Sequence, residues 1–414
     1  MIVTGQLLLV GDTPEARIEP GWIETDGERI KHCCTGEIRG DADAGDEHTL
    51  ITPGFYDAHV HLSQFEAIGA FGRTLIDWLH TVVFPSETRW GDHAYSQQKI
   101  QHALNNLLRH GTLGFAGYTT VHYAATYSAL RETENHNMCA RIGQVLMDME
   151  CPDELKRPTR QLIQECESLL EHWPSQSDGL DAPRVSASVN PRFALTCSGE
   201  LMTRAGELAH KHEAYVQTHL AEMTQEYELA TQLHEAEDYT YIYEQAGLLS
   251  PRSLFAHGVW LTSDETHRLS ESQSTVVHCP NANAFLNSGT MNFHDYQNSG
   301  LPLALGSDIG AGYETSMVRN ARSMLLNAHY LGTPAYSAEF AWWLITRGNA
   351  KYLGWNQCGH LKEQAYADFL MLRPPKFWQH THDPLGYLLF GWSDKWLTQA
   401  FLKGRPVWEN EYTI

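Results

Sequence analysis

The stretch GFYDAHVHLSQF, residues 54–65, places two histidines one residue apart in an apolar segment that follows Pro53. A short apolar run bounded by a Pro-Gly pair is typical of a buried strand. Side chains alternate along a strand, so His59 and His61 are predicted to project from the same face. Such a pair can share one metal ion, take part in acid–base chemistry, or simply fill space in the core.

Outward from this stretch, apolar segments alternate with helical patterns along the middle of the chain. TLGFAGYTTVH (112–122), AYVQTHLAE (214–222) and SLFAHGVWL (253–261) each follow a segment with helical periodicity. Strand–helix alternation of this kind predicts an α/β fold with a parallel sheet and crossover helices. Because the alternation recurs about eight times, we expect a (β/α)8 TIM barrel.

Both ends of the chain have a different pattern of short strands joined by tight turns. GWIETDGERI (21–30) has a hairpin signal at Asp26-Gly27, and TQAFLKGRPVWEN (398–410) has one at Lys403-Gly404. Two unrelated hairpins are the alternative to a single structure built from both ends. We predict a single small β-sandwich module formed by both termini, covering residues 1–50 and 355–414, around a barrel of residues 51–354.

The composition of the 414-residue chain excludes several classes of partner. Its net charge is −21, which disfavours binding to a nucleic-acid backbone. The eight cysteines form no CxxC pair and no regular framework, which favours reduced thiols and a cytoplasmic location. There is no secretory signal pattern and no apolar run long enough for a membrane span, so we expect no membrane partner.

Ionisable residues stand at the ends of the predicted strands. In a barrel these strand ends meet at one mouth, where the active site is built. We therefore expect the following side chains to gather there: His59, His61, Arg192, His219, His257, His278 and Asp308.

Four of these residues have the chemistry of a metal site. Three imidazoles, from His59, His61 and His219, with the carboxylate of Asp308, leave one position open for water. This pattern is typical of a catalytic metal site. Imidazole suits zinc, iron and manganese alike, so the sequence does not choose among these metals.

Three more residues near this mouth have distinct interpretations. Glu222 lies three residues beyond His219, where it can shuttle protons; the alternative is a surface glutamate that begins the next helix. His257 is expected to hydrogen-bond a water or the substrate. His278 is interpreted as structural.

Several motifs together resemble the amidohydrolase superfamily, in its branch of nucleobase deaminases and chlorohydrolases. PGFYDAHVHL, QTHLAE, AHGVWL, HCPNAN and LGSDIGAG occur in the order of that family. HLSQF, DWLHTVVFPSE (77–87) and NPRFALTCS (190–198) make the chain most similar to the guanine deaminase family. The resemblance implies hydrolytic deamination of guanine to xanthine and ammonia, with one zinc per chain held by His59, His61, His219 and Asp308.

The resemblance also implies roles for the other site residues. Glu222, His257 and Asp308 are the implied catalytic groups. The implied substrate-binding set is His61, Gln64, Trp78, Arg192, Phe193, His219, Glu222 and Asp308. Hydrogen bonds from Arg192 and Gln64 to the purine, with Phe193 against its face, suit a small oxopurine.

Two alternatives remain open at this point. A sibling amidohydrolase would act on another heterocycle, such as 8-oxoguanine, an adenosine derivative or an s-triazine. A non-catalytic scaffold would keep the barrel without its metal. The habit of the family suggests a homodimer.

Overall fold

The computed structural model describes residues 1–176 and 181–410; residues 177–180 and 411–414 of the predicted barrel and β-module lie outside this range. Within the described residues, eight parallel strands form one sheet in sequential order. The strands are β5 (Phe55–His61), β6 (Thr112–Tyr118), β7 (Cys139–Leu146), β8 (Val185–Pro191), β9 (Tyr215–Leu220), β10 (Ser253–His257), β11 (Thr275–His278) and β12 (Leu303–Leu305). The predicted (β/α)8 barrel is confirmed.

The first and last strands close the barrel through residues that also belong to the predicted site. The backbone N–H of Asp308 donates to the carbonyl of His59 at 2.9 Å, and that of His61 donates to the carbonyl of Ile309 at 3.0 Å. Asn349 spans the same seam, since its amide nitrogen donates to the carbonyls of Tyr56 (2.7 Å) and Leu305 (2.8 Å). Three predicted metal ligands, His59, His61 and Asp308, are thus fixed where the sheet closes.

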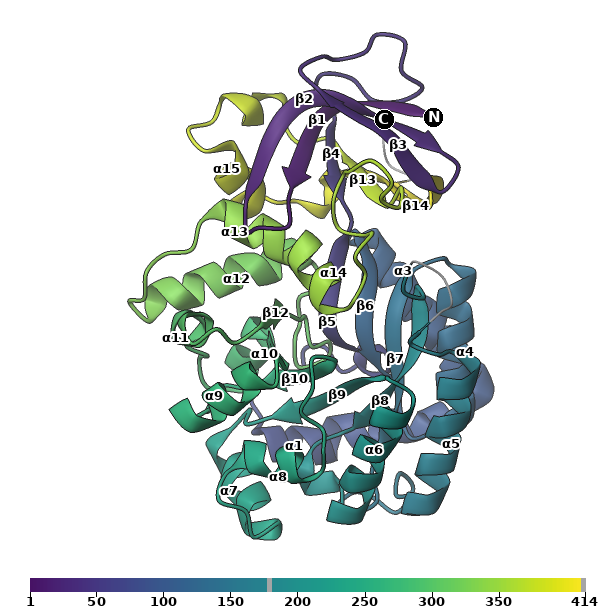
Figure 1. Cartoon of the computed structure of the whole chain (residues 1–414), viewed down its shortest axis with the longest axis vertical. Helices are drawn as coiled ribbons and strands as arrows, with labels where there is room; N and C mark the ends of the chain where they lie inside the picture. The colour runs from purple at the N-terminus through teal and green to yellow at the C-terminus, as the bar shows by residue number, and fades with distance from the viewer. Residues whose placement is uncertain (177–180, 411–414) are drawn as a thin grey trace.

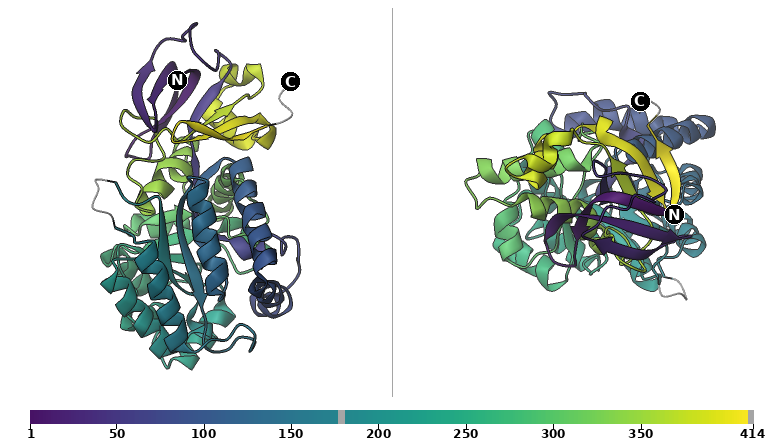
Figure 2. Two further views of the ribbon diagram at one scale, coloured as in Figure 1. Left: turned by 90° about the vertical axis from the view of Figure 1, so that its right-hand side faces the viewer. Right: turned by 90° about the horizontal axis from the view of Figure 1, so that it is seen from above.

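Helices surround the sheet, as Figures 1 and 2 show. Several begin at side-chain caps: Asp92 accepts from the N–H of Tyr95, and Ser198 accepts from that of Leu201. The helices are α1 (Leu75–Trp78), α2 (Phe84–Thr88), α3 (His93–Arg109), α4 (Tyr123–Asn135), α5 (Thr159–His172), α6 (Gly199–Lys211), α7 (Thr224–Leu233), α8 (Tyr239–Gln245), α9 (Ser263–Glu271), α10 (Pro280–Phe285), α11 (Phe293–Asn298), α12 (Met317–Tyr330), α13 (Ala338–Trp343), α14 (Asn349–Tyr352) and α15 (Pro384–Phe390). In the described part of the chain, none of them is long and apolar enough to cross a membrane.

Both ends of the chain contribute to a second sheet, above the barrel in Figure 1. Its seven strands, counted in the described residues, follow the order β15-β14-β13-β4-β1-β2-β3. They are β1 (Ile2–Val10), β2 (Ala16–Asp26), β3 (Arg29–Thr35), β4 (Leu50–Pro53), β13 (Phe369–Leu372), β14 (Leu397–Leu402) and β15 (Arg405–Glu409). One structure built from both termini is therefore present, rather than two unrelated hairpins.

The chain passes from this second sheet into the barrel at Gly54. Strand β4 pairs with β1 and β13, and β5 begins at the next residue after Gly54. A Cβ at Gly54 would lie 2.3 Å from Leu113 Cδ1, so only glycine fits this crossing. The domain limits of 1–50 with 355–414, and of 51–354, stay a prediction.

The seam of the barrel gives a first testable prediction. Asn349→Ala would remove the partners of three buried backbone groups, because Asn349 also accepts from the N–H of Leu305 at 3.0 Å. At roughly 1 kcal/mol or more for each lost partner, we expect a loss of about 3 kcal/mol in the free energy of unfolding. Thermal unfolding should show a Tm lowered by several degrees. Asn105→Ala, at an exposed position of α3, is the matched control, and an equal Tm for the two variants would contradict the prediction.

Candidate metal and substrate site

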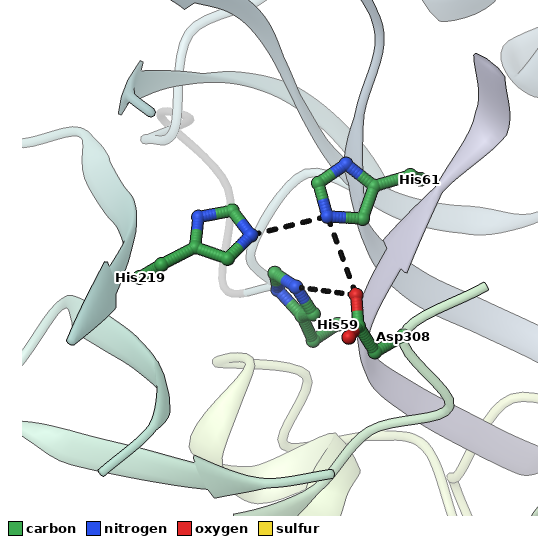
Figure 3. Close-up of side chains that lie close together, drawn as sticks. All are labelled: His59, His61, His219 and Asp308. Atoms are coloured by element: carbon green, nitrogen blue, oxygen red, sulfur yellow. Dashed lines mark hydrogen bonds and ion pairs between the residues drawn. The ribbon is translucent and has the colours of Figure 1, made fainter. Parts of the chain in front are cut away.

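The strand ends bring four predicted ligands together at the barrel mouth (Figure 3). His61 Nε2 lies 3.1 Å from His219 Nε2, and Asp308 Oδ1 lies 3.3 Å from His59 Nε2 and 3.4 Å from His61 Nε2. His59, His61 and Asp308 are buried, and His219 is partly buried. These four side chains come from β5, β9 and the segment after β12, so the fold alone makes them neighbours.

The protonation states of this cluster fit a cation. Burial lowers the pKa of His61 to about 3, and removal from water also holds the pKa of His219 well below its ordinary value. His219 Nδ1 lies 2.7 Å from the carbonyl of Arg192 and must donate to it, so its Nε2 lone pair faces His61. When His61 carries its proton on Nδ1, its Nε2 lone pair faces that of His219 at 3.1 Å, and a cation between the two nitrogens would satisfy both. The residues therefore fit a metal ion.

Asp308 supplies the negative charge that this ion needs. Burial acts to raise the pKa of Asp308, but the imidazoles of His59 and His61 beside its carboxylate outweigh that effect and hold the pKa well below its usual range. Among the described residues, His59 Nε2 has no hydrogen-bond partner of good geometry. A buried imidazole nitrogen without a partner beside a carboxylate is consistent with a metal ligand.

Asp57 ties the two ligand-bearing segments to each other. Its Oδ1 accepts from the backbone N–H groups of His59 (3.1 Å) and Ser307 (2.9 Å), and its Oδ2 accepts from Ser307 Oγ at 2.5 Å. Burial raises the pKa of Asp57 to about 6, although the hydrogen bonds from Ser307 and His59 oppose this shift. Sequence reasoning gave Asp57 no role, although it lies inside GFYDAHVHL.

The backbone is strained at the strand ends that carry the site. Ala221, His257 and Asp308 have φ angles of 48°, 74° and 51°, a region that non-glycine residues rarely adopt. Such strain persists where surrounding structure over-determines the conformation, and it clusters at functional sites. Two of these residues meet at the mouth, where His257 Nε2 lies 3.9 Å from Asp308 Oδ2.

One cavity opens beside the four ligands. Its lining includes every residue of the predicted catalytic and substrate-binding sets, whereas His59 does not reach it. Residues that line it without having been predicted are Leu75, Leu79, Glu226, Leu286 and Ala311. Trp78 and Phe193 are buried side chains that make its walls apolar, together with the leucines.

Glu222 is a buried group of this cavity, so the alternative of a surface glutamate is wrong. Its Oε1 accepts from Ser288 Oγ at 3.0 Å, and its Oε2 lies 3.4 Å from His257 Nε2. Burial and the nearby charge of Asp308 raise the pKa of Glu222 to about 8. A carboxyl group with such a pKa can exchange protons near neutral pH.

His257 also lies in the cavity, and His278 does not. His257 Nδ1 is 2.9 Å from Asn283 Oδ1, which must accept the proton, so the lone pair of Nε2 is directed at Glu222 and Asp308. His278 is buried against the ring of Phe293, with 5.8 Å between ring centroids, and burial lowers its pKa to about 3. These contacts agree with the structural interpretation of His278.

In the lining of the same cavity, Gln64 and Arg192 share a partner that sequence reasoning missed. Glu87 accepts from Arg192 Nη1 at 2.9 and 2.8 Å and from Gln64 Nε2 at 3.1 Å. Glu87 is the last residue of DWLHTVVFPSE, where an acidic residue after an apolar run was the available signal. The glycine-rich turn after Asp308 also holds Gln64, since the N–H of Gly310 donates to Gln64 Oε1 at 3.3 Å.

A second group of metal-binding side chains lies away from this cavity. Cys139 Sγ is 3.8 Å from Cys358 Sγ, and Cys358 Sγ is 3.7 Å from Asp368 Oδ2. The guanidinium of Arg184 already pairs with that carboxylate oxygen at 2.9 Å. A cation would compete with Arg184 here, so we assign no metal to this group.

Comparison with known proteins agrees with this fold. The amidohydrolase family model matches residues 50–407. A guanine deaminase of Escherichia coli (strain K12) is 34% identical over 333 residues, or 78% of this chain and 73% of that protein. A guanine deaminase of Dictyostelium discoideum is 31% identical over 309 residues, or 73% of this chain and 68% of that protein.

A solved structure of E. coli guanine deaminase superposes with a TM-score of 0.92 at 28% identity, covering 99% of this chain and 100% of that one. The family model and both sequence relatives span most of the chain, and the structural match spans nearly all of it. This protein therefore belongs to the amidohydrolase family.

Proposed function

We propose that this protein is a guanine deaminase, which hydrolyses guanine to xanthine and ammonia. The observation that carries the proposal is one apolar-walled cavity whose lining includes both metal ligands and the donors of Gln64 and Arg192. The E. coli guanine deaminase, 34% identical over most of both chains, supports the same substrate. A planar oxopurine offers an apolar face and a polar edge, which match such a cavity.

The cofactor of this proposal is one zinc ion per chain, held by His59, His61, His219 and Asp308. Three neutral imidazoles and one carboxylate are a typical set for a catalytic zinc, though imidazole also suits iron. When bound, such an ion lowers the pKa of a water ligand toward neutrality and stabilises developing negative charge. Binding requires deprotonated ligands, and the lowered pKa values of His61 and His219 meet that requirement.

The proton transfers are assigned to three side chains of the same cavity. Asp308 Oδ2 and His257 Nε2, 3.9 Å apart, receive the proton of the water that attacks C2 of guanine. Glu222 delivers a proton to the ring nitrogen next to C2, takes up the proton of the new C2 hydroxyl and passes it to the departing amine. The proton held by Asp308 and His257 then returns to Glu222. The C2–N bond breaks as the new C2–O bond is completed, which gives xanthine and ammonia.

The substrate is held at its other edge and on its faces. Arg192 and Gln64 donate to the carbonyl oxygen and a ring nitrogen, and Phe193 and Trp78 contact the ring. His61, His219, Glu222 and Asp308 surround the reacting carbon. A base without the carbonyl would leave buried donors unpaired, which is how such a site rejects it.

The setting of the enzyme follows from the same proposal. Removal of the amino group of guanine belongs to purine catabolism or salvage, which is cytoplasmic chemistry. The eight cysteines, which all lie in the described residues, are free thiols, in agreement with a reducing compartment. We also propose a homodimer, because members of this family commonly form one.

A substrate panel tests the proposed function. Purified protein loaded with zinc, iron or manganese is assayed with guanine, 8-oxoguanine, an adenosine derivative and an s-triazine, by ultraviolet absorbance and ammonia release. We expect kcat/KM for guanine to exceed that of every other compound by about 100-fold or more. Absence of ammonia from guanine at saturating metal would refute the proposal, and turnover of another compound would identify a sibling enzyme. Metal content below about half an ion per chain after loading would instead support a non-catalytic scaffold.

A further inference from the structure

Glu87 is a buried acidic side chain that the proposed reaction leaves without a role. It lies in α2 after Pro85 and is 0% exposed. Both of its carboxylate oxygens contact Arg192 Nη1, and Oε1 also accepts from Gln64 Nε2. Arg192 and Gln64 line the cavity, whereas Glu87 is not part of its lining. Glu87 therefore contacts both expected substrate donors without itself lining the cavity.

The contact with Glu87 decides which edge of Arg192 remains for a ligand. Nη1 is used by Glu87, while Nε and Nη2 have no hydrogen-bond partner among the residues that the structure describes. The ring of Phe84, whose centroid is 5.4 Å from Arg192 Cζ, supports the guanidinium from one face. The Nε–Nη2 edge thus presents two parallel donors in a fixed orientation.

Gln64 is oriented by the same carboxylate. An ionised carboxylate such as that of Glu87 can accept hydrogen bonds but cannot donate them, so the amide nitrogen of Gln64 must face it. The amide oxygen then meets the N–H of Gly310, which donates to it at 3.3 Å. A single carboxylate therefore fixes the orientation of both polar side chains.

From these contacts, and resting on the proposed function, we infer that Glu87 is a positioning residue that sets selectivity for the carbonyl edge of the purine. Two parallel guanidinium donors match an adjacent carbonyl oxygen and ring nitrogen, as on the O6–N7 edge of a 6-oxopurine. Glu87 also supplies the counter-charge without which a buried Arg192 would be costly. Neutralising Glu87 should therefore loosen recognition of the carbonyl without altering the metal ligands.

Two ligands that cannot be deaminated separate this role from a general loss of structure. Hypoxanthine has the carbonyl edge and lacks the amine, and purine lacks both. Their dissociation constants for zinc-loaded wild type and Glu87→Gln are measured by isothermal titration calorimetry, beside metal content and guanine kinetics. We expect the preference for hypoxanthine over purine to fall at least tenfold in Glu87→Gln, with purine affinity changed by less than about threefold.

Glu265→Gln is the matched control, because Glu265 is equally buried, accepts from Thr240 and Thr262, and does not line the cavity. It should keep the preference of the wild type. If Glu87→Gln does not fold, Glu87→Asp keeps the charge and shortens its reach, and it should lower the preference in the same direction.

The outcomes separate the two claims. A wild-type preference retained within about threefold by the folded Glu87 variant would overturn the inference. A wild type that prefers hypoxanthine yet releases no ammonia from guanine would refute the proposed function alone. A wild type with no preference that still releases ammonia from guanine would overturn the inference alone.

Discussion

Glu222→Gln is expected to lower kcat for guanine about 1,000-fold while the metal content stays unchanged, within the range for a lost general acid–base group. Glutamine has nearly the same shape and can still accept from Ser288 Oγ, so the wall of the cavity should be preserved. Its amide cannot release a proton, whereas burial raises the pKa of the Glu222 carboxyl to about 8. The loss should therefore appear in kcat, with KM for guanine nearly unchanged.

Steady-state kinetics and metal analysis on the same preparations check this result. Glu265→Gln again serves as the control, because it neutralises an equally buried carboxyl group that is not part of the cavity lining. If Glu222→Gln turned over guanine within about tenfold of the wild-type rate, Glu222 would have no part in proton transfer. Loss of metal in this variant would instead make Glu222 part of the metal site.

The barrel could be predicted because its signal is local and repeated. Strands such as β6 and β10 are buried along their whole length, as a parallel sheet covered by helices requires, and each follows a helical pattern. Strand β7, with the sequence CARIGQVL, ends in no ionisable residue, so the pattern of polar strand ends did not single it out. The crossing at Gly54 was not visible either, because it depends on the distant side chain of Leu113.

The site residues likewise divide into those that the sequence could predict and those that it could not. Residues at strand ends could be placed at one mouth by the fold rule alone, and the cavity lining includes five of the seven, all but His59 and His278. Glu87 and Ser288 were missed because they come from helix α2 and from a loop, and their partners are remote in the chain. Ser288, for example, lies 66 residues from Glu222. No local pattern records such a contact; only the packing of one element on another creates it.

His61→Asn is expected to remove most of the bound metal and to abolish measurable deamination. His61 Nε2 faces both His219 Nε2, at 3.1 Å, and Asp308 Oδ1, at 3.4 Å, so it occupies the centre of the ligand set. An amide is a poor substitute for imidazole at a transition-metal site, and three ligands remain. We expect at least a 100-fold loss in zinc affinity, more than is typical for a lost outer partner of a ligand.

The control for this variant is His278→Asn, which removes an equally buried strand-end imidazole that does not line the cavity. Metal content by mass spectrometry and zinc affinity by chelator competition are measured for both variants beside the wild type. His278→Asn should keep its zinc, because His278 is not among the four clustered ligand side chains. If His61→Asn kept about one zinc per chain with unchanged affinity, the assignment of His59, His61, His219 and Asp308 as one ligand set would be wrong.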